Sequence, residues 1–195
     1  VNCIKREGHE LVGENTDGKG FLASLRGVSD PTGKRIVLLG AGGAARAIGV
    51  ELALAGAAQV TVVNRSAERG STLAEVIAAC GAESEYVAWD GDYRVPEETD
   101  VLINCTPIGL FPDVNAEVPL DTATIRETMI VCDVVPNPPE TRLVQVARER
   151  GCTVLDGLGM LVNQGVIGFR WWTGVDPDAD VMRRALEDAL GLSPT

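Results

Sequence analysis

A glycine-rich turn is the first stretch of this sequence whose residues can bind a charged ligand. The apolar run of residues 35–39 is followed by Gly40-Ala41-Gly42-Gly43-Ala44-Ala45. Between a strand and a helix, the first glycine allows a tight turn, the second lets the backbone approach a pyrophosphate, and the helix N-terminus presents free N–H groups. We therefore predict that Gly40 to Ala44 bind the phosphates of a dinucleotide. The alternative is a turn chosen only for packing.

Polar residues after the next apolar run indicate which dinucleotide binds. Residues 59–63 are rich in β-branched side chains and are followed by Asn64-Arg65-Ser66-Ala67-Glu68-Arg69. NAD-binding units place an acid here to accept from the ribose hydroxyls, and this strand ends without one. Arg65 and Arg69 can instead bind the 2′-phosphate of NADP, with Asn64 and Ser66 as polar partners. The alternative is that both arginines are ordinary charges at a helix start, paired with Glu68.

The elements that must position these residues follow from alternating apolar runs and helical patterns. Short apolar runs predict strands at residues 35–39, 59–63, 85–88, 101–105, 129–135 and 153–155. Helical spacing predicts helices at residues 18–25, 43–56, 66–80, 140–150, 160–173 and 178–190, after a strand-turn-strand at 4–12. Continuous apolar strands that alternate with helices are typical of a parallel sheet covered on both faces. The predicted fold class is therefore α/β, a Rossmann-like doubly wound parallel sheet.

Composition and charge exclude several other classes of protein. The 195 residues are 45% apolar and 23% charged, as in globular chains, and the net charge of −11 argues against a nucleic-acid partner. No apolar run is long enough to span a bilayer and no targeting segment is visible, which predicts a cytoplasmic protein. Five dispersed cysteines and the single histidine, His9, predict reduced thiols and no metal site. The chain starts at Val1 without an initiator methionine, so we expect a processed chain or a fragment.

Further motifs resemble the shikimate dehydrogenase family and occur in its order along almost the whole chain. The glycine turn and the segment 64–69 resemble the family's G-A-G-G-A turn and its N-R-[ST]-x-x-R signature for NADP. The other matches are Val1-Asn2 (the end of G-A-x-N), Gly13-Glu14-Asn15-Thr16-Asp17-Gly18 (G-x-N-T-D-G), Asn104-Cys105-Thr106-Pro107-Ile108-Gly109 (N-x-T-P-x-G) and Gly157-Leu158-Gly159-Met160-Leu161-Val162-Asn163-Gln164-Gly165 (G-x-x-M-L-V-x-Q-[GA]). The chain resembles the family's carboxy-terminal cofactor-binding part and the linker before it.

The resemblance implies an activity and a set of site residues. Family members interconvert 3-dehydroshikimate and shikimate with NADPH in chorismate biosynthesis, by hydride transfer to a ring carbonyl and proton transfer by a Lys–Asp pair. Asp17 would be that Asp and a substrate ligand, although by itself it is a candidate cap for a helix at Gly18. Asn2 and Gln164 would bind substrate hydroxyls. Positions that line the nicotinamide and its ribose correspond to Thr106, Val134, Gly157 and Met160, of which Met160 is equally a candidate core residue.

The first departure from the family concerns its catalytic lysine. That lysine lies upstream of the G-A-x-N segment, and none of Lys5, Lys19 and Lys34 lies in such a motif. The resemblance therefore implies a remnant of a substrate domain at 1–20, an NADP-binding domain at 21–157 and carboxy-terminal helices at 158–195. Those helices would pack on a missing substrate domain. We expect the isolated chain to bind NADP and to turn over poorly.

The second departure is Pro136, which stands where the family has a tyrosine that lines the substrate. Proline has no hydroxyl, so one polar contact is lost, and a quinate/shikimate paralogue with a different substrate is an open alternative. Another NADP enzyme on this architecture, such as methylenetetrahydrofolate dehydrogenase, is opposed by the N-T-D-G and M-L-V-N-Q-G segments. A non-catalytic NADP-binding module is supported only by the missing lysine. The predicted partner is a small-molecule substrate, and the sequence indicates no oligomeric state.

Overall fold

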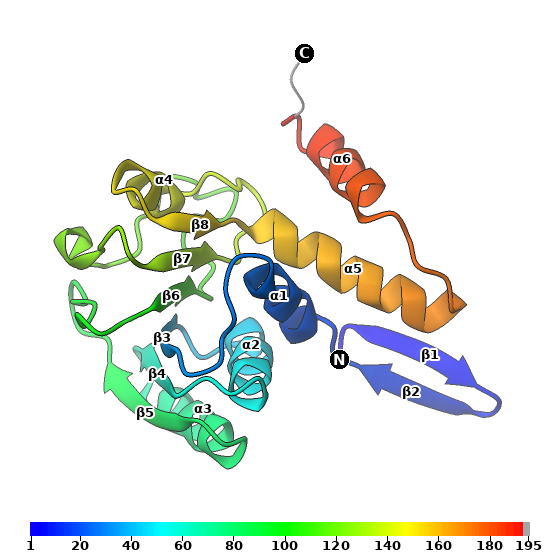
Figure 1. Ribbon diagram of the computed structural model, residues 1–195, viewed down its shortest axis with the longest axis horizontal. Coiled ribbons are helices and arrows are strands. Elements are labelled where there is room, and N and C mark those ends of the chain that lie inside the picture. The colour runs from blue at the N-terminus through cyan, green and yellow to red at the C-terminus, as the bar shows by residue number, and fades with distance from the viewer. Residues whose placement is uncertain (193–195) are drawn as a thin grey trace.

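A six-stranded parallel sheet forms the centre of the computed structural model, which describes residues 1–192. The strands lie in the order β5-β4-β3-β6-β7-β8 (Figure 1). Their bounds are β3 Arg35–Leu39, β4 Gln59–Asn64, β5 Glu83–Ala88, β6 Val101–Asn104, β7 Ile130–Asp133 and β8 Thr153–Leu155. The α/β doubly wound fold is thereby confirmed. The strand order reverses between β3 and β6, and ligands of such sheets bind at the carboxyl ends of the strands at this point.

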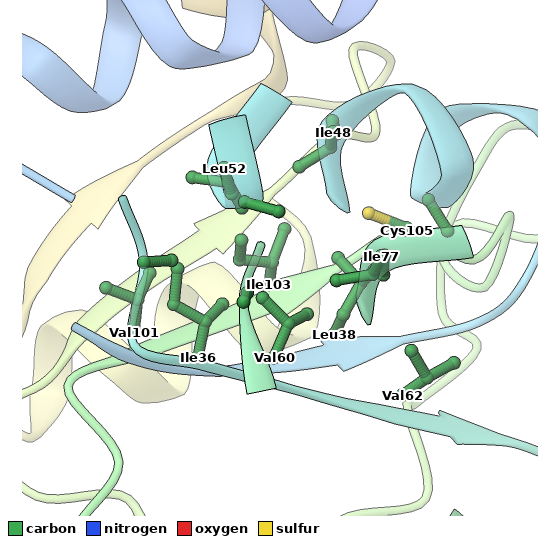
Figure 2. Packing of buried hydrophobic residues seen from close by; sticks show 14 of the residues in the cluster. Ile36, Leu38, Ile48, Leu52, Val60, Val62, Ile77, Val101, Ile103 and Cys105 are labelled. Carbon is green, nitrogen blue, oxygen red and sulfur yellow. The ribbon is translucent and has the colours of Figure 1, made fainter. Parts of the chain in front are cut away.

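The helices lie on both faces of the sheet and beyond its carboxyl edge. Along each strand, alternate residues face opposite sides, so Ile36 and Leu38 belong to one buried cluster while Val37 and Leu39 belong to another. The first cluster includes side chains of α1, α2 and α3, and Figure 2 shows Ile48 of α2 above its strands. The second cluster is covered by α4 and by the irregular segments around the short helix η1. The helix bounds are α1 Asp17–Arg26, α2 Gly43–Leu54, α3 Ala67–Ala79, η1 Thr122–Thr124, α4 Arg142–Glu149, α5 Gly157–Thr173 and α6 Ala179–Ala189.

An amino-terminal hairpin and the carboxy-terminal helices extend away from the sheet. The hairpin pairs β1 (Cys3–Glu7) with β2 (Glu10–Glu14) in antiparallel register, and it lies beside the far end of α5 (Figure 1). The Trp172 indole donates to the Ile4 carbonyl (3.1 Å), and Lys5 lies over the Trp171 ring, so both tryptophans contact the hairpin. α1 packs closely on α5, because a Cβ at Gly20 would lie 2.6 Å from the Gln164 nitrogen.

Three sequence expectations change in the structure. β5 begins at Glu83, earlier than the apolar run suggests, because edge-strand residues need not be apolar to pair with β4. β7 ends at Asp133, whose carboxylate binds the Val135 nitrogen. The alternative role of Asp17 as a helix cap is wrong: Thr16 is the N-cap residue and Asp17 is the first helical residue.

Several properties of residues 1–192 bear on the remaining expectations. None of their helices is both long and apolar enough to cross a membrane. The five cysteines are free, and burial raises the pKa of the Cys105 and Cys132 thiols. In this part of the chain, no group of three or more His, Cys, Asp and Glu residues is arranged to hold a metal ion.

Candidate functional site

The glycine turn connects β3 to α2 at the point where the strand order reverses. Gly40 has a φ of +100°, which disfavours residues with a side chain, and its nitrogen donates to the Val63 carbonyl (2.8 Å). Gly42 is the N-cap residue of α2, and no side chain of the described residues hydrogen-bonds to cap this helix. A Cβ at Gly42 or Gly43 would meet nothing within 4 Å, whereas Ala45 is fully buried. The turn therefore presents open backbone to a ligand while the following helix packs on the sheet.

The segment after β4 supplies two positive side chains with local support. Asn64 Nδ2 donates to the Ser66 carbonyl (2.9 Å), and Ser66 Oγ, at the N-cap of α3, accepts from the Arg69 nitrogen (3.4 Å). Arg65 and Arg69 are exposed. Among the ion pairs of residues 1–192 none involves Arg65, Arg69 or Glu68, so the alternative pairing of these arginines with Glu68 is absent. Both guanidinium groups are available to a phosphate.

The three residues assigned to the substrate lie together at the start of α1. Asn2 Nδ2 lies within hydrogen-bond distance of Asp17 Oδ1 (2.8 Å) and Gln164 Oε1 (3.2 Å). Asn2 precedes β1, Asp17 begins α1 and Gln164 lies on α5, and α1 packs closely on α5 at Gly20. The structure thus brings together polar side chains that are up to 162 residues apart in sequence.

Thr16 is the buried centre of this cluster, and sequence reasoning gave it no role. Its backbone nitrogen donates to Asn2 Oδ1 (2.8 Å), and its hydroxyl lies 2.9 Å from Asn2 Nδ2 and 3.3 Å from Gln164 Oε1. The side chain is fully buried. The signal was present, because Thr16 lies inside the G-x-N-T-D-G segment. We infer that Thr16 fixes the orientation of Asn2 and Gln164 while leaving the Asp17 carboxylate accessible.

A buried polar network supports the loops that follow β6 and β7. Asn104 and Asp133 are register partners at the ends of these strands, and Asn104 Nδ2 donates to Asp133 Oδ1 (3.1 Å). The oxygen of the same amide, Asn104 Oδ1, accepts from the nitrogen (3.1 Å) and the hydroxyl (2.7 Å) of Thr106. The hydroxyl of Thr141, the N-cap of α4, donates to Asp133 Oδ2 (2.7 Å). The network therefore holds the loop that carries Thr106 against the adjacent strand.

Burial of the Asp133 carboxyl raises its pKa, while hydrogen bonds from Thr141, Val135 and Asn104 act in the opposite direction. A buried carboxyl with this many donors is satisfied rather than strained, because each of its oxygens has a partner. Neither Asn104 nor Asp133 was predicted as a site residue. Each is a polar residue at the end of a buried apolar strand, which is the signal that identifies them.

The remaining predicted cofactor residues lie around the same edge. Val134 follows β7, and its nitrogen donates to the Asn104 carbonyl (3.1 Å). Gly157 begins α5, where a Cβ would lie 2.3 Å from the Val135 carbonyl oxygen, so glycine is required for this close approach. Met160 is half-buried and packs against the first core cluster, which supports the core alternative for it. Pro136 is half-buried beside Gly157.

Comparison with known proteins identifies the family. Residues 23–136 match the family described as "Shikimate / quinate 5-dehydrogenase", and residues 157–187 match the "Shikimate 5'-dehydrogenase C-terminal domain". The chain belongs to the shikimate/quinate dehydrogenase family. The NADP-dependent shikimate dehydrogenase of Moorella thermoacetica is 44% identical to it over 99% of this chain and 66% of the relative. The chain spans about two thirds of the length of such curated relatives.

Two solved structures extend this comparison. The ligand-free 5-ketofructose reductase of Gluconobacter sp. strain CHM43 is 53% identical, with a TM-score of 0.92 over 97% of this chain and 68% of that one. A shikimate dehydrogenase in complex with NADP+ is 37% identical, with a TM-score of 0.87 over 96% of this chain and 66% of that one. Proteins that are similar to this chain are therefore named for different substrates.

Proposed function

We propose that this chain is the cofactor-binding part of an NADP-dependent dehydrogenase that interconverts 3-dehydroshikimate and shikimate. The observation that carries the proposal is the cluster of Asn2, Asp17 and Gln164, three polar groups that meet at one point although they come from different elements. The family membership and the NADP-dependent relatives support the same reaction. Such a cluster suits a polyol, because it offers amide donors, amide acceptors and a carboxylate to adjacent hydroxyls.

The residues present fit NADP. The open space at Gly42 and Gly43 admits a pyrophosphate at the N-terminus of α2, where the helix dipole favours an anion. Arg65 and Arg69 would bind the 2′-phosphate, and Thr106 and Val134 would flank the nicotinamide end. When bound, NADPH supplies the hydride to the substrate carbonyl.

Asp17 would act at the substrate oxygen, together with the lysine of the family's Lys–Asp pair. Its carboxylate accepts a hydrogen bond from Asn2 Nδ2 and retains a second oxygen for a substrate hydroxyl or an ammonium group. We propose that Asp17 holds the lysine as an ammonium, from which the proton is transferred. The domain boundaries stated above, at residues 20 and 157, and a cytoplasmic location remain part of this proposal.

A second candidate substrate is 5-ketofructose, and Pro136 favours it. Pro136 lacks the hydroxyl that the family's tyrosine would offer to shikimate, and the 53% identical neighbour is named as a 5-ketofructose reductase. Both reactions reduce a ketone beside hydroxyl groups, so the polar cluster serves either substrate. The choice depends on which hydroxyl positions the pocket satisfies.

The decisive experiment compares both ketones in the full-length protein. NADPH oxidation is measured with 3-dehydroshikimate and with 5-ketofructose, and the ratio of kcat/KM values identifies the substrate. No oxidation with either ketone would refute the proposed function. Pro136→Tyr is expected to improve the use of 3-dehydroshikimate relative to 5-ketofructose by about fivefold or more. Pro136→Phe is the matched control, because it adds the ring without the hydroxyl.

The 195-residue chain allows a separate test of the cofactor. We expect it to bind NADP more tightly than NAD, because NAD lacks the phosphate that Arg65 and Arg69 would bind. We also expect little turnover of shikimate, since the lysine of the pair is absent from the matching motifs. Tighter binding of NAD, or robust turnover by this chain, would contradict the assignment.

A further inference from the structure

A small pocket lies at the carboxyl ends of β4 and β5, and Arg65 is the one lining residue to which the proposed function assigns a role. Its volume is about 130 Å³ and it is lined by Arg65, Trp89, Gly91, Ile108 and Pro119. Arg65 follows β4, Trp89 follows β5 and Ile108 lies in the loop after β6. The pocket therefore lies at the same edge of the sheet as the glycine turn, beyond the end of β4.

Trp89 is held in place from two sides. Its backbone nitrogen donates to the Asn64 carbonyl (3.1 Å), which ties it to the residue before Arg65. Its indole Nε1 donates to the Pro119 carbonyl (3.0 Å), and the ring packs against the second core cluster. These contacts fix the plane of the ring and satisfy its only polar group. The part of the indole that lines the pocket is thus a preformed apolar surface.

The covalent structure of NADP connects this pocket to the arginine. The adenine and the 2′-phosphate are carried by neighbouring carbons of one ribose, so a phosphate bound by Arg65 places the base close to Arg65. Since Arg65 itself lines the pocket, the base can enter it without leaving the guanidinium. The lining also has the chemistry of a base site, because an indole and a planar guanidinium stack on an aromatic ring, and Ile108 and Pro119 add apolar side chains to it.

We propose that Trp89 is the surface on which the adenine of NADP stacks, with Arg65 binding the 2′-phosphate at the mouth of the same pocket. The proposal rests on the NADP-dependent function given above and adds a residue that selects for an aromatic base. Base–aromatic stacking is strong enough that its loss weakens binding by roughly five- to a hundredfold.

The test uses the 195-residue chain and 2′,5′-ADP, which contains the base, the ribose and the 2′-phosphate without the nicotinamide. Binding is expected to quench tryptophan emission in the wild type and in Trp172→Phe, and the quench is expected to disappear in Trp89→Phe. Trp172 is a suitable control because it lies on α5 and contacts the hairpin. Affinity is measured separately by calorimetry, which does not depend on the tryptophan signal.

Trp89→Leu keeps an apolar side chain against the second cluster and removes the aromatic ring. It is expected to weaken 2′,5′-ADP binding by at least fivefold, while Trp89→Phe, which still stacks, is expected to stay within about threefold of the wild type. If the wild type binds and Arg65→Ala weakens binding but Trp89→Leu does not, the adenine proposal is overturned and NADP dependence stands. If the wild type does not bind 2′,5′-ADP at all, both the adenine proposal and the assigned cofactor fall.

Discussion

Replacement of Gly42 by alanine separates the binding role of the glycine turn from its structural role. The Gly42 backbone is extended (φ −91°, ψ −167°), and a Cβ there would meet nothing within 4 Å. At an N-cap, alanine is about 1 kcal/mol worse than the best caps and glycine a few tenths worse, while the stiffer unfolded chain of the alanine variant returns about 0.4–1 kcal/mol. We therefore expect Gly42→Ala to change the free energy of unfolding by no more than about 0.5 kcal/mol.

The same methyl group is expected to obstruct NADP, because it would occupy the space through which a phosphate approaches the N-terminus of α2. Loss of one charge-assisted hydrogen bond costs about 1.5–3 kcal/mol, or roughly a ten- to hundredfold rise in Kd. At a concentration of 100 times the wild-type Kd, NADP stabilises the wild type by about 2.7 kcal/mol, and a variant with a hundredfold higher Kd by about 0.4 kcal/mol.

Gly40→Ala is the matched comparison, and urea unfolding with and without NADP is the assay. Gly40 has a φ of +100°, and a Cβ there would lie 3.1 Å from the Thr106 methyl, so this variant is expected to lose about 1–3 kcal/mol without any ligand. Calorimetry provides the Kd directly. The reasoning is refuted if Gly42→Ala binds NADP as tightly as the wild type, or if it is as unstable as Gly40→Ala.

Three further changes test other parts of the structure. Arg65→Ala is expected to raise the Kd of NADP by about tenfold to a hundredfold and to leave the Kd of NAD nearly unchanged, as calorimetry would show; equal effects on both would remove the 2′-phosphate assignment. The raised pKa of Asp133 means that folding favours the protonated carboxyl. The stability that this protonation contributes is present at pH values below the unfolded-state pKa, and it is lost as pH rises through the folded-state pKa. The wild type, compared with Asp133→Asn by urea unfolding, should therefore lose relative stability as pH rises through the acid range, and a gain would contradict the dominant effect of burial. Gly20→Ala should cost about 1–3 kcal/mol, because its Cβ would lie 2.6 Å from the α5 backbone. Gly165→Ala should cost less, because its Cβ would meet only the flexible end of a methionine at 3.2 Å. Similar losses of stability for the two variants in thermal unfolding would argue against close packing of α1 on α5.

The sheet was predictable because buried parallel strands are continuous apolar runs. Residues 35–39 and 59–63 are such runs, and both are strands in the structure. β5 was less clear because its exposed edge residues Glu83 and Glu85 interrupt the pattern. The end of β7 was not predictable. The apolar run continues to Val135, but the Val135 nitrogen donates to the Asp133 side chain.

The individual site residues were predictable from their motifs, but the contacts between them were not. The open space at Gly42 agrees with the expected backbone approach, because glycine spacing directly reflects local conformation. The pairing of Asn104 with Asp133 depends on β6 and β7 being neighbours, and strand order is not a local property of the sequence. The same holds for Thr16, whose partners come from both ends of the chain.

The contacts that join Asn2 to Gln164 also set an order in which the two halves of the site can form during folding. Near the 2′-phosphate segment, the Tyr86 hydroxyl donates to the Asn64 carbonyl and joins residues 22 apart in sequence, whereas the Asn2–Gln164 contact joins residues 162 apart. By loop entropy alone the longer closure costs about 1.8 kcal/mol more. A nascent chain can therefore form the part of the cofactor site around Gly42 and Arg65 before α5 brings Gln164 to Asn2. Binding of the 2′-phosphate end of the cofactor should then appear earlier in synthesis, and substrate recognition should appear last and be the first property lost when α5 detaches.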